Sequence, residues 1–554
     1  MSESKVSVRS GEPSKRCPVL IAGGGPSGLA LAIELGWRGV ACILVEQSDG
    51  TVEFPTTNLA NTRTSEHLRR WGLIDQIRFA GFPPDFPRSY IFVTRVFGHE
   101  LARFEHPSNG DPQSRSPYSP EGRIWCPKHF FDPVLQRHAK ATRSVQLCFN
   151  TRLESFHQDA NRVLAEVFDI AHNRREQITA DYLVGCDGGG SSVRRQLGIR
   201  MEGNFVEGQN VAILFRSSRL LSNSHGKAVM YQVSNHKVLG AVAAVDGHEL
   251  WRVNLRGIRP DQLPSLDSAQ LVRDSLGPDV PFEVLSVRPW DAHRVVAERY
   301  GKGRVFLAGD AAHLLWPAGG FGMNTGIGDS VDLGWKLAAT IQGWGGPRLL
   351  DSYEPERRPI GIRNVNEAGD MRADFDVQIP TSALLEEDSE EGNRLREKAR
   401  EAILRTRAKE FQHDSVGIEL GYRYDGSPIC VPDETPPPPE DHATYVPTTW
   451  PGARAPHVWL QDGRSTLDLF GRGFILLVLS SKIADTSAFA FAAEQVELPL
   501  KVVTLDEPGV RELYESPFVL VRPDGHVAWR GDSVPVNAAD IIEQVRGARL
   551  EIRT

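Results

Sequence analysis

The sequence has no cysteine pair in a CxxC spacing, no long apolar run and no excess of basic residues. Its six cysteines are scattered over 554 residues, which argues against a disulfide framework or a metal site and favours reduced thiols in a cytoplasmic protein. No run of about 18 apolar residues occurs, so we expect no membrane-spanning helix. The net charge is −8, which argues against nucleic-acid binding.

The residues that are present are typical of a multidomain α/β protein. Hydrophobic residues make up 40% and charged residues 24% of the chain, as in soluble globular proteins, and 554 residues exceed what one hydrophobic core can hold. Apolar runs that lead through glycine turns into helical patterns indicate parallel βα units. The stretch 211–255 instead reads as successive antiparallel strands.

The first glycine-rich junction is "GGGPSG" at residues 23–28, a G-x-G-x-x-G between an apolar strand and a helix. Glu46 ends the next strand, as the dinucleotide fingerprint requires. Gly23 allows the tight turn, Gly25 lets a pyrophosphate approach the backbone, and Gly28 permits close helix–sheet packing. The helix N-terminus offers free N–H groups, and Glu46 can accept ribose hydroxyls. The alternative is a purely structural turn.

Two more glycine-rich junctions follow, "CDGGGSSVRR" from Cys186 and "GDAAHLLWPAGGFGMNTGIGDS" from Gly309. Asp187 follows an apolar strand, and the alternative to a ligand role is an Asx turn that caps a helix. Asp310 can accept from a sugar hydroxyl. The backbone of residues 319–324 can present N–H groups to a developing negative charge, although a simple helix cap is again possible.

The three motifs in this order resemble the single-component FAD-dependent aromatic hydroxylases, class A flavoprotein monooxygenases that include para-hydroxybenzoate hydroxylase and phenol hydroxylase. The resemblance covers about residues 17–365, and its most specific part is "GRVFLAGDAAHLLWPAGGFGMNTGIGDSVDLGWKLA". It implies one FAD held at both ends rather than two nucleotide sites. It also implies an α/β fold: a Rossmann-like FAD-binding domain with an inserted mixed-sheet substrate domain.

The resemblance assigns roles along the cofactor. Glu46 would bind the adenosine ribose, Asp310 the ribityl chain, and the backbone of residues 320–324 would face the flavin N1/O2 edge. Pro317, Gly320, Gly322 and Met323 would surround the reactive ring, and no side-chain base is assigned. The full set of implied FAD residues is Gly23, Gly25, Pro26, Ser27, Gly28, Glu46, Lys128, Asp187, Arg194, Gly309, Asp310, Pro317, Gly322, Met323 and Asn324.

The sequence departs from the family at two positions near the expected flavin. Many members have Pro-Arg-Ala where this chain has Pro55-Thr56-Thr57, so that cation is missing unless Arg63 or another residue replaces it. Lys128 stands where a glutamine is common. It would restore positive charge near the FAD, or it is a solvated lysine at a helix start.

The sequence does not identify a base for a phenolic substrate. A histidine titrates near neutrality and could remove such a proton, but surface or core histidines are far more common. The candidates in or next to the expected substrate domain are His225, His236, His248 and His293, with Tyr231 and Arg216 as similar cases.

The C-terminal region resembles the thioredoxin-like appendage of the phenol hydroxylase branch, but without CxxC it is not expected to exchange disulfides. We expect it to serve packing or dimer contact. The expected division of the chain is a disordered tail at 1–16, the FAD-binding domain at 17–84, 126–204 and 285–375, the substrate domain at 85–125 and 205–284, a helical and proline-rich connection at 376–442, and the thioredoxin-like domain at 443–554.

The function that the resemblance implies is hydroxylation of a phenolic or other electron-rich ring through a flavin C4a-hydroperoxide. FAD, O2 and transiently bound NADPH or NADH would take part. The partners that the family leads us to expect are a small aromatic substrate and a second copy of the chain. Epoxidation and decarboxylating or denitrating hydroxylation are alternatives that use the same FAD motifs. A non-catalytic FAD-binding protein is a further alternative.

Overall fold

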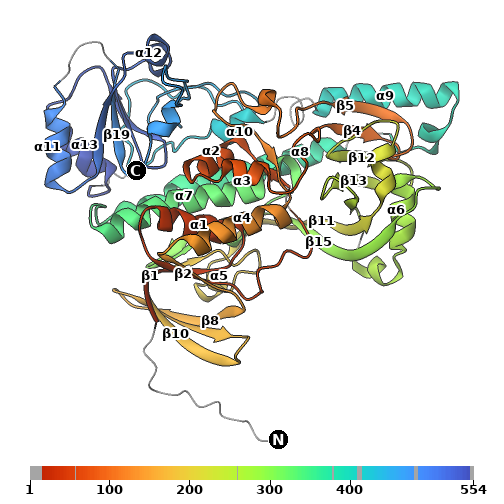
Figure 1. Cartoon of the computed structure of the whole chain (residues 1–554), viewed down its shortest axis with the longest axis horizontal. Helices are drawn as coiled ribbons and strands as arrows, with labels where there is room; N and C mark the ends of the chain where they lie inside the picture. Colours follow the sequence, from red (N-terminus) through yellow and green to blue (C-terminus); the bar gives the residue numbers. More distant parts are fainter. Residues whose placement is uncertain are drawn as a thin grey trace, which may run out of the picture.

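A computed structural model describes residues 15–56, 58–258, 260–376, 380–407, 415–479 and 485–549. Figure 1 shows a first sheet below the long helix α7 (Phe321–Gln342), a second sheet at one end of the molecule, and a small domain at the other end. Most of the expected N-terminal tail lies outside the described residues, and the first strand already begins at Lys15.

The first sheet is the expected parallel one. Its order is β16-β17-β10-β1-β2-β7, and the central neighbours β17, β10, β1, β2 and β7 run parallel. The antiparallel strands β8 and β9 extend β10. The bounds are β1 (Lys15–Ala22), β2 (Cys42–Val45), β7 (Val145–Cys148), β8 (Thr151–Gln158), β9 (Val163–Asp169), β10 (Arg174–Gly185), β16 (Gly301–Lys302) and β17 (Val305–Leu307).

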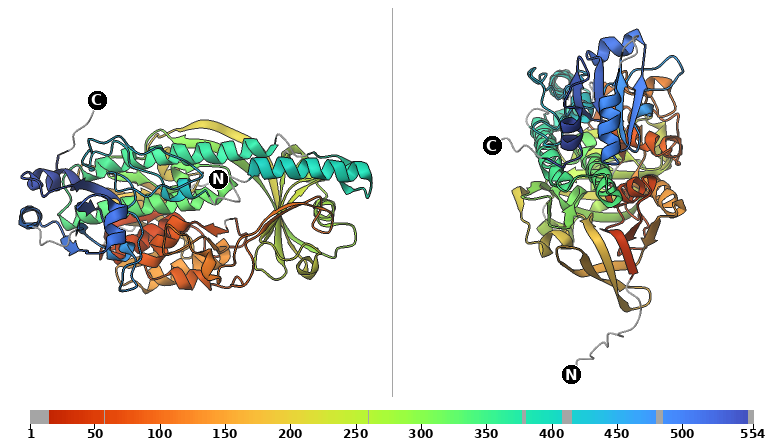
Figure 2. Two further views of the ribbon diagram at one scale, coloured as in Figure 1. Left: turned by 90° about the horizontal axis from the view of Figure 1, so that it is seen from above. Right: turned by 90° about the vertical axis from the view of Figure 1, so that its left-hand side faces the viewer.

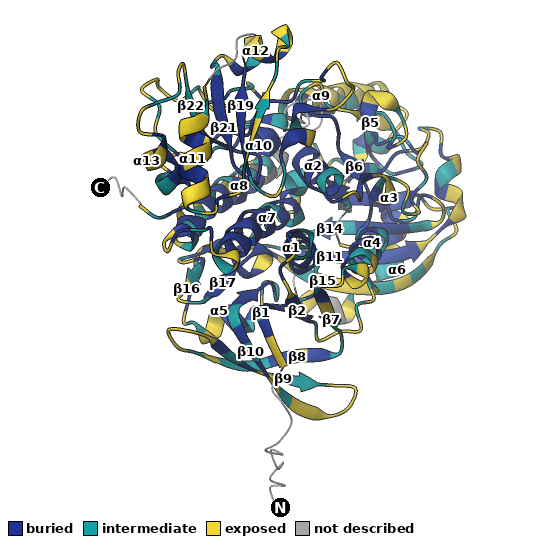
Figure 3. Cartoon of the chain, turned by 60° about the vertical axis from the view of Figure 1, so that its left-hand side comes forward, coloured by how far each residue is buried: buried dark blue, intermediate teal, exposed yellow. Residues whose placement is uncertain are grey.

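Helices cover this sheet because their apolar residues need burial. The helix α1 (Pro26–Trp37) begins with proline in its first turn, and it buries eight consecutive residues against the sheet and α7. The dark colour of α7 in Figure 3 reflects the burial of 16 of its residues. The other elements of this domain are α2 (Thr62–Arg70), α3 (Ile74–Arg78), α4 (Lys128–Ala141), α5 (Ser192–Gln196), α8 (Tyr353–Asp376), β3 (Leu59–Ala60) and β6 (Ile124–Trp125).

The second sheet forms the inserted domain, in the order β18-β15-β11-β14-β13-β12-β4-β5. Strands β11 to β14 confirm the antiparallel run expected from the sequence. The expected boundaries at residues 205 and 285 both fall inside strands, because β11 and β15 pair along almost their whole lengths. The bounds are β4 (Tyr90–Val93), β5 (Glu100–Phe104), β11 (Met201–Arg216), β12 (Met230–Ser234), β13 (Leu239–Ala244), β14 (Leu250–Arg256), α6 (Ser268–Leu276), β15 (Glu283–Ala297) and β18 (His313–Leu314).

The C-terminal domain is thioredoxin-like, with a four-stranded sheet in the order β20-β19-β21-β22. Only β19 and β20 run parallel in this sheet. The helices α11 and α13 share one hydrophobic core with Trp335 of α7, so the domain packs directly on the long helix. The bounds are β19 (Phe474–Val478), α11 (Ser487–Gln495), β20 (Leu500–Thr504), α12 (Pro508–Tyr514), β21 (Phe518–Val521), β22 (Val527–Gly531) and α13 (Ala538–Val545).

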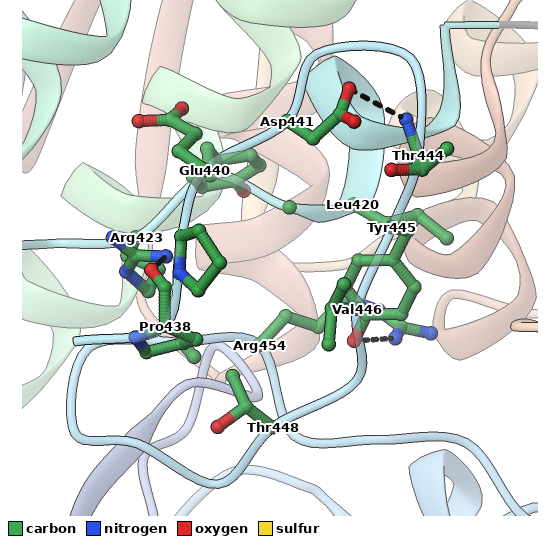
Figure 4. A pocket seen from close by; sticks show the side chains of 14 residues that line it. Leu420, Arg423, Pro438, Glu440, Asp441, Thr444, Tyr445, Val446, Thr448 and Arg454 are labelled. Carbon is green, nitrogen blue, oxygen red and sulfur yellow. Dashed lines mark hydrogen bonds between the residues drawn. The ribbon is translucent and has the colours of Figure 1, made fainter.

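The described parts of the connection between the domains pack on the rest of the molecule. In Figure 2 the helix α9 (Glu390–Arg407) continues the line of α8 past the second sheet, where it packs on β5. After α10 (Val416–Leu420), the proline-rich segment crosses the molecule beside a small pocket (Figure 4). There Arg423 donates to the carbonyl of Pro438, and Arg454 donates to the Tyr445 hydroxyl. The segment is therefore a packed crossing rather than a free linker.

Among the helices that the structure describes, none is long and apolar enough to cross a membrane.

Candidate cofactor and substrate site

The three glycine-rich junctions meet because the strands that precede them are parallel neighbours. Gly23 follows β1, Glu46 follows β2, Asp187 follows β10, and Gly309 lies two residues beyond β17. The carboxyl ends of parallel strands share one edge of the sheet, which is where open α/β sheets bind ligands. Residues almost three hundred positions apart in the chain thereby line one site.

The first junction has the backbone geometry that a pyrophosphate needs. Gly23 has a φ of +109°, and a Cβ there would lie 2.2 Å from the carbonyl oxygen of Cys186. A Cβ on Gly28 would lie 2.0 Å from the carbonyl oxygen of Gly23. Nothing lies within 4 Å of a Cβ placed on Gly25, and α1 begins there without a side-chain cap. The unpaired N–H groups of the first turn, which start at Ser27 because proline has none, thus lie beside open space at Gly25.

Ser27 joins the first junction to the third. A Cβ on Gly309, whose φ is +63°, would lie 2.4 Å from the Ser27 hydroxyl oxygen, and one on Gly326 would lie 2.3 Å from it. The Ser330 hydroxyl donates to the carbonyl of Ser27 at 2.8 Å. Close approach of α1, α7 and the Gly309–Ala311 turn therefore depends on glycine at two positions.

Asp310 and Lys128 lie close enough to interact electrostatically at this junction. Asp310 is exposed on the side of the site, but the protein atoms packed around it desolvate its carboxyl and raise its pKa. The nearby His313 and Lys128 offset only part of this rise. Lys128 begins α4 and forms an ion pair with the buried Asp132, whose pKa is raised by burial to about 6. Lys128 thus lies at a helix start, as the sequence allowed, and beside the expected ribityl site.

The loop before α7 forms the wall expected to face the flavin ring. Pro317 is exposed, and Gly319 and Gly320 both have a φ of +69°. The first turn of α7 has no side-chain cap, which leaves N–H groups of Gly322 and Met323 directed away from the helix. The amide of Asn324 accepts from Asn61 N at 2.9 Å and donates to the carbonyl oxygens of Leu59 and Gly320, at 3.1 and 2.6 Å. This links the wall to β3.

The second junction is held by its own side chains. Asp187 accepts from the Ser191 hydroxyl at 2.5 Å and from the N–H groups of Ser192 and Val193 in the first turn of α5, whose N-cap residue is Ser191. Arg194 donates to the carbonyl of Ala311 at 3.1 Å and to that of Gly189. Arg194 thus holds the turn that carries Asp310, and Asp187 holds the start of α5. A direct contact of either residue with a cofactor stays a prediction.

Sequence reasoning missed a buried triad behind the wall. Asp329 accepts from Gly309 N at 3.1 Å, from His313 Nε2 at 2.7 Å and from Arg357 Nε at 2.8 Å. All three side chains are buried. The sequence feature that points to this triad is the pair Asp329 and Asp332 inside a largely apolar helix. A charge in such a pattern needs a partner that only the fold supplies.

The missing family arginine is not replaced by Arg63. Arg63 donates to Glu66 and to the carbonyl of Asp524, and so faces the C-terminal domain. The buried cation beside the Pro55 segment is instead Arg252 of β14, which donates to the carbonyl of Pro55. Burial lowers the pKa of Arg252 to about 10.

Arg252 belongs to one side of the second sheet, which we call the polar face. Strand alternation and register place together on it the residues Asn210, Ala212, Leu214, Gln232, Ser234, Ala241, Ala243, Arg252 and Asn254. The Oδ1 of Asn210, the Oε1 of Gln232 and the Oγ of Ser234 are buried and have no hydrogen-bond partner among the described residues. Such groups are rare in folded proteins and indicate a ligand or water.

The polar face adjoins the wall of the first domain. Phe54 packs with Ala212 and Leu214 of β11, and Trp290 of β15 lies edge-on to Trp316 with ring centroids 6.2 Å apart. Trp316 immediately precedes Pro317. These contacts join the polar face to the loop that is expected to face the flavin ring.

The candidate bases lie elsewhere. Tyr231 is buried on the opposite side of the sheet, where it donates to the carbonyl of Gly226, and burial raises its pKa to about 12. His225 contacts the carbonyl of Gly98, and His293 accepts from Val206 N. His236 lies near Glu386, His248 is exposed, and Arg216 pairs with Glu249 and Glu283 at the surface. Arg216 ends β11 on the side of the polar face, but it is exposed there and ion-paired. The structure thus brings none of the four histidines and not Tyr231 onto the polar face.

The donor groups fit FAD. The uncapped start of α1 suits two phosphates, Glu46 lies at the end of β2, and the uncapped start of α7 suits the electron-rich edge of a flavin. Glu46 Oε2 accepts from Gly24 N at 2.7 Å, which holds its carboxylate over the glycine turn. FAD bound here would bridge the first and third junctions.

Comparisons with known proteins agree with this geometry. Residues 16–368 match the FAD binding domain family, and residues 448–548 match the family described as aromatic-ring hydroxylase, C-terminal. A putative polyketide hydroxylase of Streptomyces halstedii is 34% identical over 564 residues, which cover 96% of each chain. The 2,4-dichlorophenol 6-monooxygenase of Delftia acidovorans is 32% identical over 559 residues, covering 92% of this chain and 94% of the relative.

A solved structure extends the match to the fold. The rebeccamycin biosynthetic enzyme RebC with reduced flavin is 39% identical and superposes with a TM-score of 0.90, covering 97% of this chain and all of that one. Both sequence and fold thus agree over nearly the whole length. The chain belongs to the class A FAD-dependent monooxygenases that carry an aromatic-ring hydroxylase C-terminal domain.

Proposed function

We propose that the protein uses FAD, O2 and NADPH or NADH to hydroxylate an electron-rich aromatic ring that lies on the polar face. The observation that carries this is the set of buried oxygen atoms of Asn210, Gln232 and Ser234. Each unsatisfied buried polar group costs about 1–3 kcal/mol, and a ligand that donates hydrogen bonds removes that cost. Hydroxyl groups on an aromatic ring are suitable donors.

The small residues of the polar face favour a flat substrate with several rings. Ala212 of β11 and Ala241 and Ala243 of β13 lie on either side of β14, which contributes Asn254 and Arg252 to the same face. A floor of small side chains with hydrogen-bonding groups between them suits a polycyclic hydroxyaromatic better than a single phenol ring. The similarity to a putative polyketide hydroxylase supports this class, and the similarity to a dichlorophenol monooxygenase supports the smaller alternative.

Each part of the site would have a separate task. The starts of α1 and α7 would bind the diphosphate and the flavin edge through backbone N–H groups. Trp290, Trp316 and Phe54 would exclude water from the reacting region. Bound FAD supplies electron transfer and oxygen activation. The cation of Arg252 would stabilise a phenolate oxygen, and the phenolate form activates the ring carbons ortho and para to it.

The test is a substrate screen with purified, FAD-loaded protein. Phenols, catechols, aromatic acids and polycyclic hydroxyaromatics are compared for stimulated NADPH and NADH oxidation, oxygen uptake and a product heavier by one oxygen atom. We expect the polycyclic group to give the strongest coupled turnover. Turnover of monocyclic phenols alone would reject the substrate class, and failure to bind flavin would reject the function.

Arg252 also favours a second candidate, decarboxylating hydroxylation of an aromatic acid. A buried guanidinium is suited to a carboxylate, to which it donates charge-assisted hydrogen bonds. Release of CO2 in step with NAD(P)H oxidation distinguishes this reaction from simple hydroxylation.

A further inference from the structure

The C-terminal domain inserts one turn between four helices of the FAD-binding domain. This turn, Arg522–His526, joins β21 to β22, and Arg522, Asp524 and His526 are all buried. The chain around it belongs to a thioredoxin-like domain without CxxC. Without CxxC the domain cannot exchange disulfides. The contacts of this turn indicate a different function for it.

Arg522 connects the turn to α7 and α8. Its guanidinium donates to Glu356 of α8 at 2.6 and 2.9 Å and to Asp332 of α7 at 3.2 Å. Lys336 of α7 donates to Asp332 at 2.7 Å and to Glu356 at 2.6 Å. With Asp524, these five side chains form a buried cluster of two cations and three carboxylic acids, each at most 2% exposed.

The backbone of the turn connects it to α1 and α2. The carbonyl of Pro523 accepts from Arg38, which ends α1, at 3.3 Å and from Arg70 of α2 at 3.2 Å. The carbonyl of Asp524 accepts from Arg63 of α2 at 2.8 Å. The His526 ring packs on Tyr424 with centroids 4.4 Å apart.

The same helices carry the flavin wall. Arg357, next to Glu356 on α8, holds Asp329 of α7, and Asp329 holds Gly309 N. The start of α2 meets the start of α7 where Asn61 N donates to Asn324. A shift of α7 or α2 relative to the first sheet would therefore move the wall around residues 317–324.

We propose that the 522–526 turn sets the position of α7 and α2, so that Arg522 is a positioning residue for the flavin wall. The role of the C-terminal domain is then to fix the geometry of the FAD site from behind. This rests on the FAD site assigned above and goes beyond the reaction proposed for it.

The test compares Arg522→Met and Arg522→Lys with a control, Arg530→Met. Arg530 lies on β22 of the same domain and bonds to Asp433, Thr449 and Thr435 outside the four helices. In folded Arg522→Met we expect at least tenfold weaker FAD binding, an altered visible flavin spectrum and a larger share of NAD(P)H consumption ending as H2O2. Arg522→Lys should be intermediate, and the control should stay within twofold of the native protein.

A purely structural role predicts a different pattern. Folded Arg522→Met would then melt earlier yet keep the native FAD affinity, spectrum and coupling, and this result overturns the proposal. If Arg522→Met does not fold, the double variant Arg522→Met/Asp524→Asn keeps the net charge of the cluster and is judged by the same limits, as is Arg522→Lys. If the native protein binds no FAD, the proposed function fails first, which separates the two failures.

Discussion

At the scale of single residues, glycine controls how closely the two ends of the site approach. Gly309 and Gly326 leave space that the Ser27 hydroxyl fills. The sequence motif identified Gly309, whereas the need for glycine at 326 appears only when α7 lies against α1. A Cβ at either position would separate the pyrophosphate end of the site from the ribityl end.

Substitution of Gly309 by alanine should weaken FAD binding at least tenfold. The new Cβ would lie 2.4 Å from Ser27 Oγ and would hold a positive φ that costs on the order of 1–2 kcal/mol. Fluorescence titration with FAD measures the change. The matched control is Gly471→Ala, where nothing lies within 4 Å of the added methyl group. Equal FAD affinity in the two variants would contradict the close contact.

At the scale of elements, the strand pattern predicted the second sheet but not which of its two sides is the polar face. Alternation predicted the strands β11 to β14, but it did not say which side of the sheet would meet the cofactor. Contacts of Phe54, Pro55 and Trp316 with the sheet decide this, and they come from distant parts of the chain. Tyr231 was a candidate in the sequence and lies on the other side.

The substitution Ala241→Leu tests the polar face. The larger side chain would project from β13 into the proposed floor, so KM for a polycyclic substrate should rise about tenfold or substrate-stimulated NAD(P)H oxidation should disappear. FAD affinity should be unchanged, because Ala241 lies on the second sheet and the residues expected to bind FAD lie in the first domain. Ala443→Leu, directly after the proline-rich connection and away from the second sheet, serves as the control. Native substrate kinetics in Ala241→Leu would place the substrate elsewhere.

At the scale of the whole molecule, buried charges join the C-terminal domain to the rest. Arg454 binds Glu66 of α2, and Arg522 binds Glu356 of α8. Removing one partner from such a pair leaves an uncompensated buried charge and typically costs 3–5 kcal/mol. The two units should therefore unfold together rather than separately.

The stability of the whole chain should fall between about pH 6.5 and pH 4. Burial lowers the pKa of His526 to about 4 from an ordinary value near 6.5, so the unfolded chain takes up this proton first as the pH falls. The full shift is worth on the order of 3 kcal/mol. Glu66, with a pKa lowered to about 2 by its arginine partners against the effect of burial, adds a loss only below about pH 4.5.

Urea unfolding at several pH values measures this. His526→Gln should show a shallower fall in the free energy of unfolding between pH 6.5 and pH 4 than the native protein does. His172→Gln, at an exposed histidine, should keep the native slope. An unchanged slope in His526→Gln would show that other groups take up the protons.

The sequence by itself determined the FAD-binding motifs, the inserted second sheet and the small C-terminal domain, because each depends on local patterns of glycine, apolar runs and strand alternation. Asp187 illustrates the limit: the same Asp-Gly pattern fits a ligand contact and a contact with a helix start. The structure shows the second, and the ligand contact stays a prediction. Only the tertiary structure assembled the Asp329 triad, the polar face and the 522–526 turn. These depend on partners that are far apart in the chain, and burial, which gives them their energy, exists only after the domains pack.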